Sequence, residues 1–321
     1  MADPAHTFVS ESGLVTSNSH ALSVAIDSLY GAYLKANYPL EYFTVTMSLY
    51  SGDIPRTICL TKELEYFGIE LKGIKFRYSK ADYNMDRETN SIFKGLSSVK
   101  YISAGLAEQL YAMKDEHFDS FIDFLDVNPC DSKQTSILIC LGYFDEFGDR
   151  SVLQQIQSLY LAWRHRKQIS IDSCPLPQES MLKYATNTGK TYKIFDTVGM
   201  IKELCGREDI KPMSLQEIVR AEIEYLGYIN YVNKDLADDY YVIDINAKFS
   251  PVVKAYSFGT GETITMKINK QIYANAPLSK NDIIRVYFTE LRPKARKLPD
   301  GTWERSKGEF DKWITSYSIV K

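Results

Sequence analysis

The hydropathy pattern of this chain changes its period near residue 238, and this change limits the folds that the chain can adopt. Before that point, apolar residues recur at spacings of three and four, as along residues 22–33, which is typical of an amphipathic helix. After it, apolar and polar residues alternate, as in residues 263–268, 284–288 and 313–318, which is typical of half-buried strands. The sequence therefore predicts a helical part followed by a β-domain.

The β-part predicts about five strands within about 80 residues, because residues 240–245 and 252–258 add two more runs of strand-forming residues. A small closed barrel such as an OB-fold accommodates five short strands without exposed edges. Gly259 and Gly261 lie between two of the strands, where a hairpin turn is favoured over a phosphate-binding loop, since no helix follows. The predicted fold class is α+β and multidomain, with the helical region first and a five-stranded OB-like β-barrel last.

Helix-capping residues divide the helical part. Pro39 is expected to end one helix and open the next, and Ser103, Asp131 and Asp149 can each cap a helix. The segment SLQE at residues 214–217 is a capping box. We expect a flexible start (1–16), a helical region (17–80), a module of small helices (81–150), a helical connector with one strong helix (151–235) and the barrel (236–321).

Composition excludes several classes of protein. The net charge of −3 excludes a uniformly basic nucleic-acid coat, although it leaves room for a local basic groove. The five cysteines include no C-x-x-C pair and the four histidines are far apart, so neither a zinc site nor a disulfide scaffold is expected. No apolar run reaches the length of a membrane span and the start does not resemble a signal peptide, so a cytoplasmic protein is expected. Phosphate-loop and G-x-S-x-G motifs are also absent, which disfavours an unrelated enzyme.

Basic and aromatic residues in the barrel segment give the strongest functional indication. Residues 292–297 (RPKARK) are expected to form a loop between the last two strands, close to an aromatic residue that follows. Cations that contact phosphates and rings that stack on bases are typical of proteins that bind single-stranded nucleic acid. The alternative interpretation of this segment is a solvated hairpin. The candidate DNA-binding residues of the barrel are Lys248, Lys254, Tyr256, Lys267, Arg292, Lys294, Arg296, Lys297 and Trp303.

Five further segments, taken in order, resemble one family. The stretches SHA (19–21) and AYLKANYPLEY (32–42) are similar to the end of the fingers domain in the bacterial DNA polymerase III alpha subunit. LEYFGI (64–69), FKGLSSVK (93–100), FDSFIDF with GYFDEFG (118–124 and 142–148) and EIEYLG (222–227) resemble its later segments in family order. The resemblance implies the end of the fingers, a helix–hairpin–helix module at residues 81–150 and an OB domain. A phage-encoded or split version of the polymerase is the form that this part of the family pattern suggests.

The resemblance also implies a duplex contact at the first hairpin, where Lys100, Ser103 and Gly105 are the candidate DNA-binding residues and Gly105 keeps a family glycine. This chain departs from the family at Tyr101 and Ser103, which stand where the family has glycines. Glycines let backbone amides approach phosphates closely, so the hairpin either binds duplex poorly or is structural. A clamp-binding motif is weakly suggested by Gln157, Leu159 and Leu161; the buried face of a long helix is the alternative interpretation.

The family's catalytic palm, whose carboxylates hold two Mg²⁺ ions, has no counterpart in these residues. The resulting hypothesis is a DNA-binding C-terminal portion of a polymerase III alpha-like protein, either excised or a natural half of a split polymerase. It would hold primed template through duplex and single strand, would need no cofactor of its own, and would not polymerise alone. Its expected partners are DNA, a catalytic half in trans and a sliding clamp, and no membrane association is expected. The alternative is a polymerase-derived interaction protein that no longer binds DNA.

Overall fold

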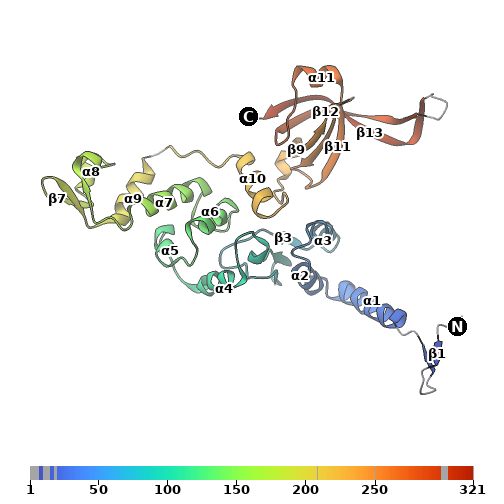
Figure 1. Cartoon of the computed structure of the whole chain (residues 1–321), viewed down its shortest axis with the longest axis horizontal. Helices are drawn as coiled ribbons and strands as arrows, with labels where there is room; N and C mark the ends of the chain where they lie inside the picture. The colour runs from blue at the N-terminus through green and yellow to red at the C-terminus, as the bar shows by residue number, and fades with distance from the viewer. Residues whose placement is uncertain are drawn as a thin grey trace. The chain divides into compact units, whose positions relative to one another are not determined.

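The computed structural model describes residues 7–9, 15–17, 20–207, 209–248, 250–297 and 303–320 (Figure 1). The chain divides into two compact units, the first comprising residues 1–135 and 142–147 and the second residues 136–141 and 148–321. The predicted order of a helical region followed by a five-stranded barrel is confirmed. Among the described residues, no helix has the length and apolar character that crossing a membrane requires.

The first unit begins with a short hairpin and three helices. Strands β1 (Thr7–Val9) and β2 (Val15–Ser17) pair antiparallel within the start that was expected to be flexible. Helices α1 (His20–Asn37), α2 (Pro39–Leu49) and α3 (Ile54–Tyr66) follow. Pro39 opens α2 as predicted, and the Asp53 side chain caps α3 by accepting a hydrogen bond from the Arg56 N–H. The fully buried Phe43 and Met47 anchor a core between α2 and α3.

A three-stranded sheet continues the first unit. Strand β5 (Ser91–Phe93) lies between β3 (Glu70–Lys72), to which it is parallel, and β4 (Asn84–Asp86), to which it is antiparallel. Gly95 follows β5 in close contact with the backbone, since a Cβ at this position would lie 2.6 Å from the Ala81 carbonyl oxygen. The glycine is therefore required for the chain to turn from the sheet into the next helices.

Small helices follow the sheet and belong to the first unit, except for residues 136–140, which belong to the second. They are η1 (Leu96–Ser98), α4 (Ala104–Ala112), η2 (Met113–Asp115), α5 (Phe121–Val127), α6 (Ser132–Cys140) and η3 (Asp145–Phe147). Ser103 caps α4 and Asp131 caps α6, as predicted. The fully buried Phe76 contacts the rings of Phe124 and Phe144, so these short helices enclose an aromatic core.

The second unit contains a module that the sequence did not predict. After α7 (Arg150–Trp163), strands β6 (Gln168–Ser170), β7 (Ala185–Asn187) and β8 (Thr191–Ile194) form a sheet in the order β6-β8-β7. Turn η4 (Ile171–Ser173), α8 (Gln178–Met181) and α9 (Thr197–Gly206) complete it. Within the expected helical connector (151–235), Met181, Tyr192 and Met200 lie in a core of their own. The strands are too short for a clear alternation of apolar residues.

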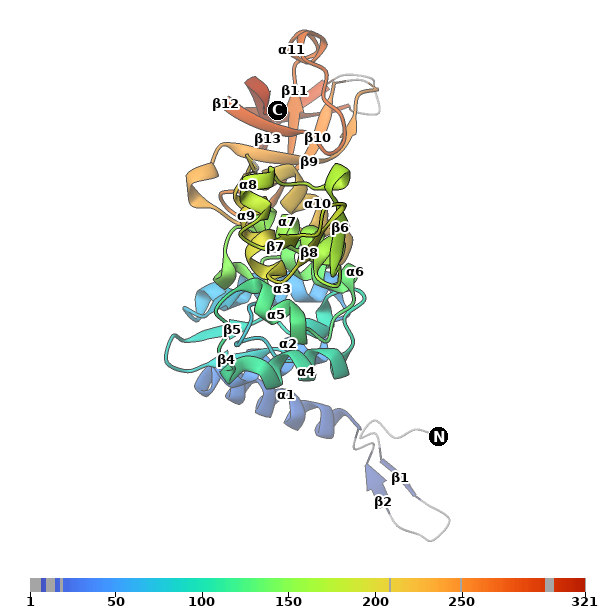
Figure 2. The ribbon, with the colours of Figure 1, turned by 90° about the vertical axis from the view of Figure 1, so that its left-hand side faces the viewer.

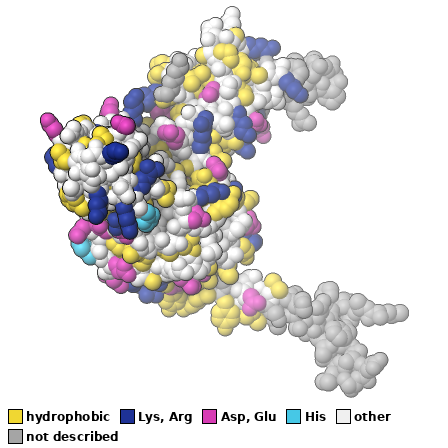
Figure 3. Space-filling view, turned by 60° about the vertical axis from the view of Figure 1, so that its left-hand side comes forward, with side chains coloured by type: hydrophobic (Ala, Val, Ile, Leu, Met, Phe, Trp, Pro, Cys, Tyr) yellow, Lys and Arg dark blue, Asp and Glu magenta, His cyan; other side chains and the backbone are white. Residues whose placement is uncertain are grey.

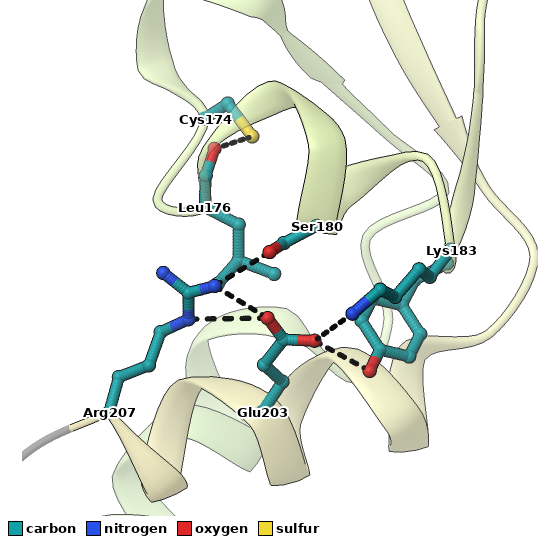
Figure 4. A network of polar contacts seen from close by, with 7 residues as sticks. Cys174, Leu176, Ser180, Lys183, Glu203 and Arg207 are labelled. Carbon is teal, nitrogen blue, oxygen red and sulfur yellow. Dashed lines mark hydrogen bonds and ion pairs between the residues drawn. The ribbon is translucent and has the colours of Figure 1, made fainter.

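Polar contacts join α8 to α9 in this module (Figure 4). One Glu203 carboxylate oxygen accepts hydrogen bonds from Arg207 at 2.7 and 3.2 Å, and the other accepts one from the Tyr184 hydroxyl at 2.7 Å. Arg207 also donates to the Ser180 hydroxyl at 2.6 Å. These bonds lower the pKa of Glu203 to about 2, the Tyr184 bond contributing most. The Glu203 carboxylate therefore stabilises the packing of α9 against α8 and the residues that follow it.

The barrel consists of β9 (Asp239–Asn246), β10 (Val252–Ser257), β11 (Thr263–Ile268), β12 (Ile283–Lys297) and β13 (Trp303–Val320). The strands close in the order β10-β11-β13-β12-β9, and only the β11–β13 pair is parallel. Helix α11 (Lys270–Asn275), between β11 and β12, packs its Ile272 and Tyr273 against the barrel core and lies at one end of the barrel (Figure 2). Helix α10 (Leu215–Tyr225), which begins with the predicted capping box, and η5 (Lys234–Leu236) precede the barrel.

The last two strands extend beyond the barrel. Strand β12 pairs with β9 only at residues 283–285, and β13 pairs with β11 only at residues 313–314. From there the two strands pair only with each other, as far as Lys297 and Trp303, and form a ribbon (Figure 1). The prediction of a loop at residues 292–297 is wrong. Its charged residues resemble a solvated loop, yet the segment is a paired strand, and Lys294 forms an ion pair across the ribbon with Glu309 at 3.1 Å.

Candidate nucleic-acid interface

The first hairpin lies between η1 and α4 and carries three of the predicted residues. Lys100, Ser103 and Gly105 are all exposed. The Ser103 hydroxyl accepts a hydrogen bond from the Leu106 N–H, and the Ser103 carbonyl accepts one from Ala107. The first N–H groups of a helix have no partner inside the helix, so those of Ala104 and Gly105 remain available to an anion. This helix start can therefore contact a phosphate.

The second hairpin lies between α5 and α6 and, unlike the first, carries a carboxylate at the start of its helix. The Asp131 carboxylate accepts a hydrogen bond from the Gln134 N–H at 2.7 Å, and the Gln134 side chain accepts one from the Asp131 N–H at 3.0 Å. A carboxylate therefore already occupies the position at the start of α6 where an anion would bind. The two hairpins are not equivalent, and the first is the better candidate for a phosphate contact.

The barrel presents a second candidate surface on the outer face of β10, β11 and β13. Lys254 is exposed and lies opposite Thr265, and Lys267 lies opposite Trp313. The Arg292 guanidinium lies 4.5 Å from the centre of the Trp313 ring, and the Lys267 ammonium lies 5.9 Å from it. Cations and a flat ring thus share one surface, which we call the Trp313 face and define by Lys254, Lys267, Arg292 and Trp313.

Acidic side chains neutralise part of the positive charge of the Trp313 face. Lys267 forms an ion pair with Asp311 at 2.6 Å, and Arg292 forms one with Glu290. Among the described residues, neither Lys248 nor Lys254 forms an ion pair. Basic and acidic side chains are also interspersed elsewhere (Figure 3), as the net charge of −3 requires. Local charge at the Trp313 face therefore depends most on Lys254.

The other predicted barrel residues fall in three different places. Tyr256 is buried and its hydroxyl donates to the Tyr231 carbonyl oxygen, so its expected position on an exposed strand face is wrong. Lys248 is exposed between β9 and β10, and Lys294 is exposed on the ribbon. The backbones of Arg296, Lys297 and Trp303 belong to the ribbon, whereas their side chains lie outside the described part of the structure.

The three residues of the suggested clamp motif do not share one exposed surface. They lie in the middle of α7, where Gln157 is buried and Leu159 packs against the core of the small sheet module. Leu161 is exposed. The geometry fits the alternative interpretation, in which this segment is the packed face of a helix.

Three residues of these surfaces were missed by sequence reasoning. Trp313 was recognised as part of an aromatic strand face but was not connected with the basic residues. Tyr101 and Lys133 lie together at the first hairpin, with the Lys133 ammonium 3.9 Å from the centre of the Tyr101 ring. The alternation of β13 contained the signal for Trp313, whereas no sequence pattern brings Tyr101 next to Lys133.

The remaining features of the described residues concern metal binding, one buried thiol and one hollow. No group of three or more His, Cys, Asp or Glu side chains there is placed to hold a metal ion. Burial and the nearby Asp131 raise the pKa of the Cys130 thiol to about 12, so this thiol stays protonated at neutral pH. A hollow of about 680 Å³ beside β4 is lined by charges of both signs, including Lys80, Asp86 and Arg87.

Comparisons with known proteins agree with the geometry. A family model described as a helix-hairpin-helix motif matches residues 68–153. The chain is 26% identical over 232 residues to DNA polymerase III subunit alpha of Ureaplasma parvum, covering 70% of this chain and 21% of that protein. It is 26% identical over 221 residues to the Chlamydia pneumoniae subunit, covering 65% of this chain and 16% of that protein. It is 28% identical over 135 residues to a Mycobacterium tuberculosis subunit, covering 40% of this chain and 11% of that protein.

The chain thus spans about a fifth or less of the length of these relatives. The matched helix-hairpin-helix segment contains both hairpins described above, and the barrel follows it, as the order of the sequence motifs predicted. By its sequence, this chain resembles the C-terminal part of the bacterial DNA polymerase III alpha subunit.

Proposed function

We propose that this chain is a DNA-binding portion of a replicative polymerase and holds primed template. The first hairpin would contact the backbone of the duplex, and the barrel would hold the single strand. The Trp313 face carries this proposal, because it combines an aromatic ring with cations on one outer surface. Single-strand binding proteins use this combination, in which cations track phosphates and rings stack on bases.

The connectivity of the barrel supports the assignment of single-strand binding. Numbered in chain order, its strands close as 2-3-5-4-1, with a helix between the third and fourth strands. We interpret this arrangement as an OB-fold, in which the face of strands 2 and 3 and the 1–2 and 4–5 loops bind oligonucleotides. Here Lys248 follows the first strand, Lys254 and Lys267 lie on the second and third, and the ribbon replaces the 4–5 loop.

The proposal assigns catalysis to another part of the polymerase. The carboxylates of a palm would hold two Mg²⁺ ions. A longer chain or a separate catalytic half would supply that palm. A split polymerase, a phage origin and a place in the bacterial cytoplasm belong to the same proposal. Within it, the described residues position DNA and leave nucleotidyl transfer to the palm.

The experiment tests the hairpin and the barrel separately, each with its own form of DNA. We expect Lys100→Gln to weaken binding of blunt duplex more than of single strand, since Lys100 lies at the first hairpin. Arg296→Ala with Lys297→Ala should weaken single-strand binding and flatten its salt dependence. Fluorescence anisotropy with matched oligonucleotides measures both. If neither variant lowers the affinity for its own form of DNA, the assignment of duplex to the hairpin and of single strand to the barrel is wrong.

A second candidate function, protein interaction, is favoured by α1. Its apolar side chains are exposed rather than packed: Leu29 is 70% exposed and Tyr30 is 65% exposed. Helices with such residues usually bury them against a partner. Under this alternative, the partner is a palm-containing polymerase part or a sliding clamp. Surface plasmon resonance with each protein tests it: Leu29→Lys should abolish binding, while DNA affinity of the wild type stays at background.

A further inference from the structure

The first hairpin holds a residue in a backbone conformation that residues with a Cβ rarely adopt. Tyr101 has φ of 71°, in the left-handed region where glycine is favoured, and its side chain is 59% exposed. Exposure means that burial of the ring does not compensate for this conformation. Residues held in such regions often belong to functional sites, and the surrounding structure must then fix them.

Two side chains from the start of α6 hold Tyr101 in place. The Gln134 amide donates a hydrogen bond to the Tyr101 carbonyl oxygen at 3.0 Å. The Lys133 ammonium lies 3.9 Å from the centre of the Tyr101 ring, close enough for a cation–π contact. The second hairpin, whose own anion position is filled by a carboxylate, thus fixes the tip of the first hairpin.

Two lysines are neighbours of Tyr101, one in the chain and one in space. Lys100 precedes Tyr101 in the chain and is exposed, and Lys133 covers the ring on one side. Within the described part of the chain, neither lysine forms an ion pair with a carboxylate. An exposed ring with one lysine over it and another next to it in the chain suits one nucleotide, with its base on the ring and its phosphates on the ammonium groups.

We propose that Tyr101 is a stacking platform for one unpaired base, so that the first hairpin recognises the junction between duplex and single strand. This inference rests on the proposed DNA binding and adds the form of DNA that is recognised. The available N–H groups of Ala104 and Gly105 would hold a phosphate of the duplex. The Tyr101 side chain projects from the hairpin tip, where it hinders close approach of an intact duplex and accepts a base that has left the stack.

The test compares binding of two oligonucleotides by the full chain. One is a blunt duplex hairpin, and the other carries a single unpaired 2-aminopurine at its end. The variants are Tyr101→Gly, which removes the ring and suits the left-handed backbone, and Tyr101→Phe, which keeps the ring. Tyr66→Ala is the matched control, because Tyr66 is 87% exposed in the same unit and lies at the end of α3.

We expect the wild type, Tyr101→Phe and Tyr66→Ala to prefer the unpaired end by roughly 5-fold or more, and to quench 2-aminopurine fluorescence. Tyr101→Gly should reduce that preference to about 1 and abolish quenching, a loss that follows from the stacking energy of one base. It should also raise the thermal midpoint, because glycine adopts the left-handed backbone without strain.

Two results would overturn the inference, and they are distinguishable. If Tyr101→Gly binds both oligonucleotides with the wild-type preference and quenching, the platform is refuted while DNA binding stands. If the wild type binds neither oligonucleotide at low salt, the proposed function fails together with this inference.

Discussion

The Trp313 face allows the stacking and electrostatic parts of single-strand binding to be separated by substitution. A base stacked on an aromatic ring contributes about 1–3 kcal/mol. Arg292 already lies on the Trp313 ring at 4.5 Å, so a base must displace a contact of about 0.5–1 kcal/mol at an exposed site. The net loss expected for Trp313→Ala is therefore about 0.5–2 kcal/mol, roughly 2- to 30-fold in Kd, with little change in salt dependence.

Charge substitutions on the same face should give the opposite pattern. Each phosphate contact with single-stranded DNA contributes a slope of about −0.7 in log K against log salt, which is roughly 2.6-fold in affinity between 50 and 200 mM salt. Lys254 has no carboxylate partner among the described residues, so Lys254→Gln should remove about one such contact. Asp311→Asn should act in reverse and steepen the slope, because it frees Lys267 from its ion pair.

The assay is fluorescence anisotropy with a labelled single strand at several salt concentrations. Phe310→Ala is the matched control, since Phe310 is 50% exposed and lies three residues before Trp313, on the opposite face of the same strand. It should bind like the wild type. The reasoning is refuted if Phe310→Ala and Trp313→Ala weaken binding equally, or if Trp313→Ala and Lys254→Gln change the salt slope by the same amount.

Three further predictions concern stability. The Tyr143 hydroxyl is buried and has no hydrogen-bond partner among the described residues, so Tyr143→Phe should stabilise the chain by about 1 kcal/mol in urea unfolding, and a loss of stability would contradict this. The pKa of Glu203 is lowered to about 2, so its stabilising effect is complete above about pH 4.5 and is lost as the pH falls towards 2. Glu203→Gln should remove that part of the pH dependence of the thermal midpoint, and an unchanged pH profile would argue against the network. Gly95→Ala should destabilise the chain by about 1–3 kcal/mol, because the added Cβ would lie 2.6 Å from the Ala81 carbonyl oxygen. Gly105→Ala should stabilise the chain by about 0.5–1 kcal/mol, because it lies in a helix and its Cβ would meet open space. Equal effects of the two variants in chemical denaturation would refute the distinction.

Local signals in the sequence predicted most of the fold. Pro39, Ser103 and the capping box at Ser214 lie where helices begin, because capping and the geometry of proline depend on neighbouring residues alone. The alternation after residue 238 located all five barrel strands for a similar reason. These features need no information from distant parts of the chain.

Long-range pairing explains what the sequence did not predict. The ribbon was taken for a loop because its backbone partners are on the other strand, as is Glu309, the ion-pair partner of Lys294. Tyr256 was placed on the surface because the cover supplied by residues 229–236 is separated from it in sequence. The contact of Lys133 with the Tyr101 ring likewise joins two hairpins that are about 30 residues apart in the sequence.

The most direct test of the central claim is the binding of the wild-type chain to primed template, duplex and single strand at low and moderate salt, measured by fluorescence anisotropy. The account predicts salt-sensitive binding that is tightest for primed template, because the hairpin and the barrel then act on one molecule. Binding no tighter than that of an unrelated acidic protein at low salt, for all three forms of DNA, would contradict it.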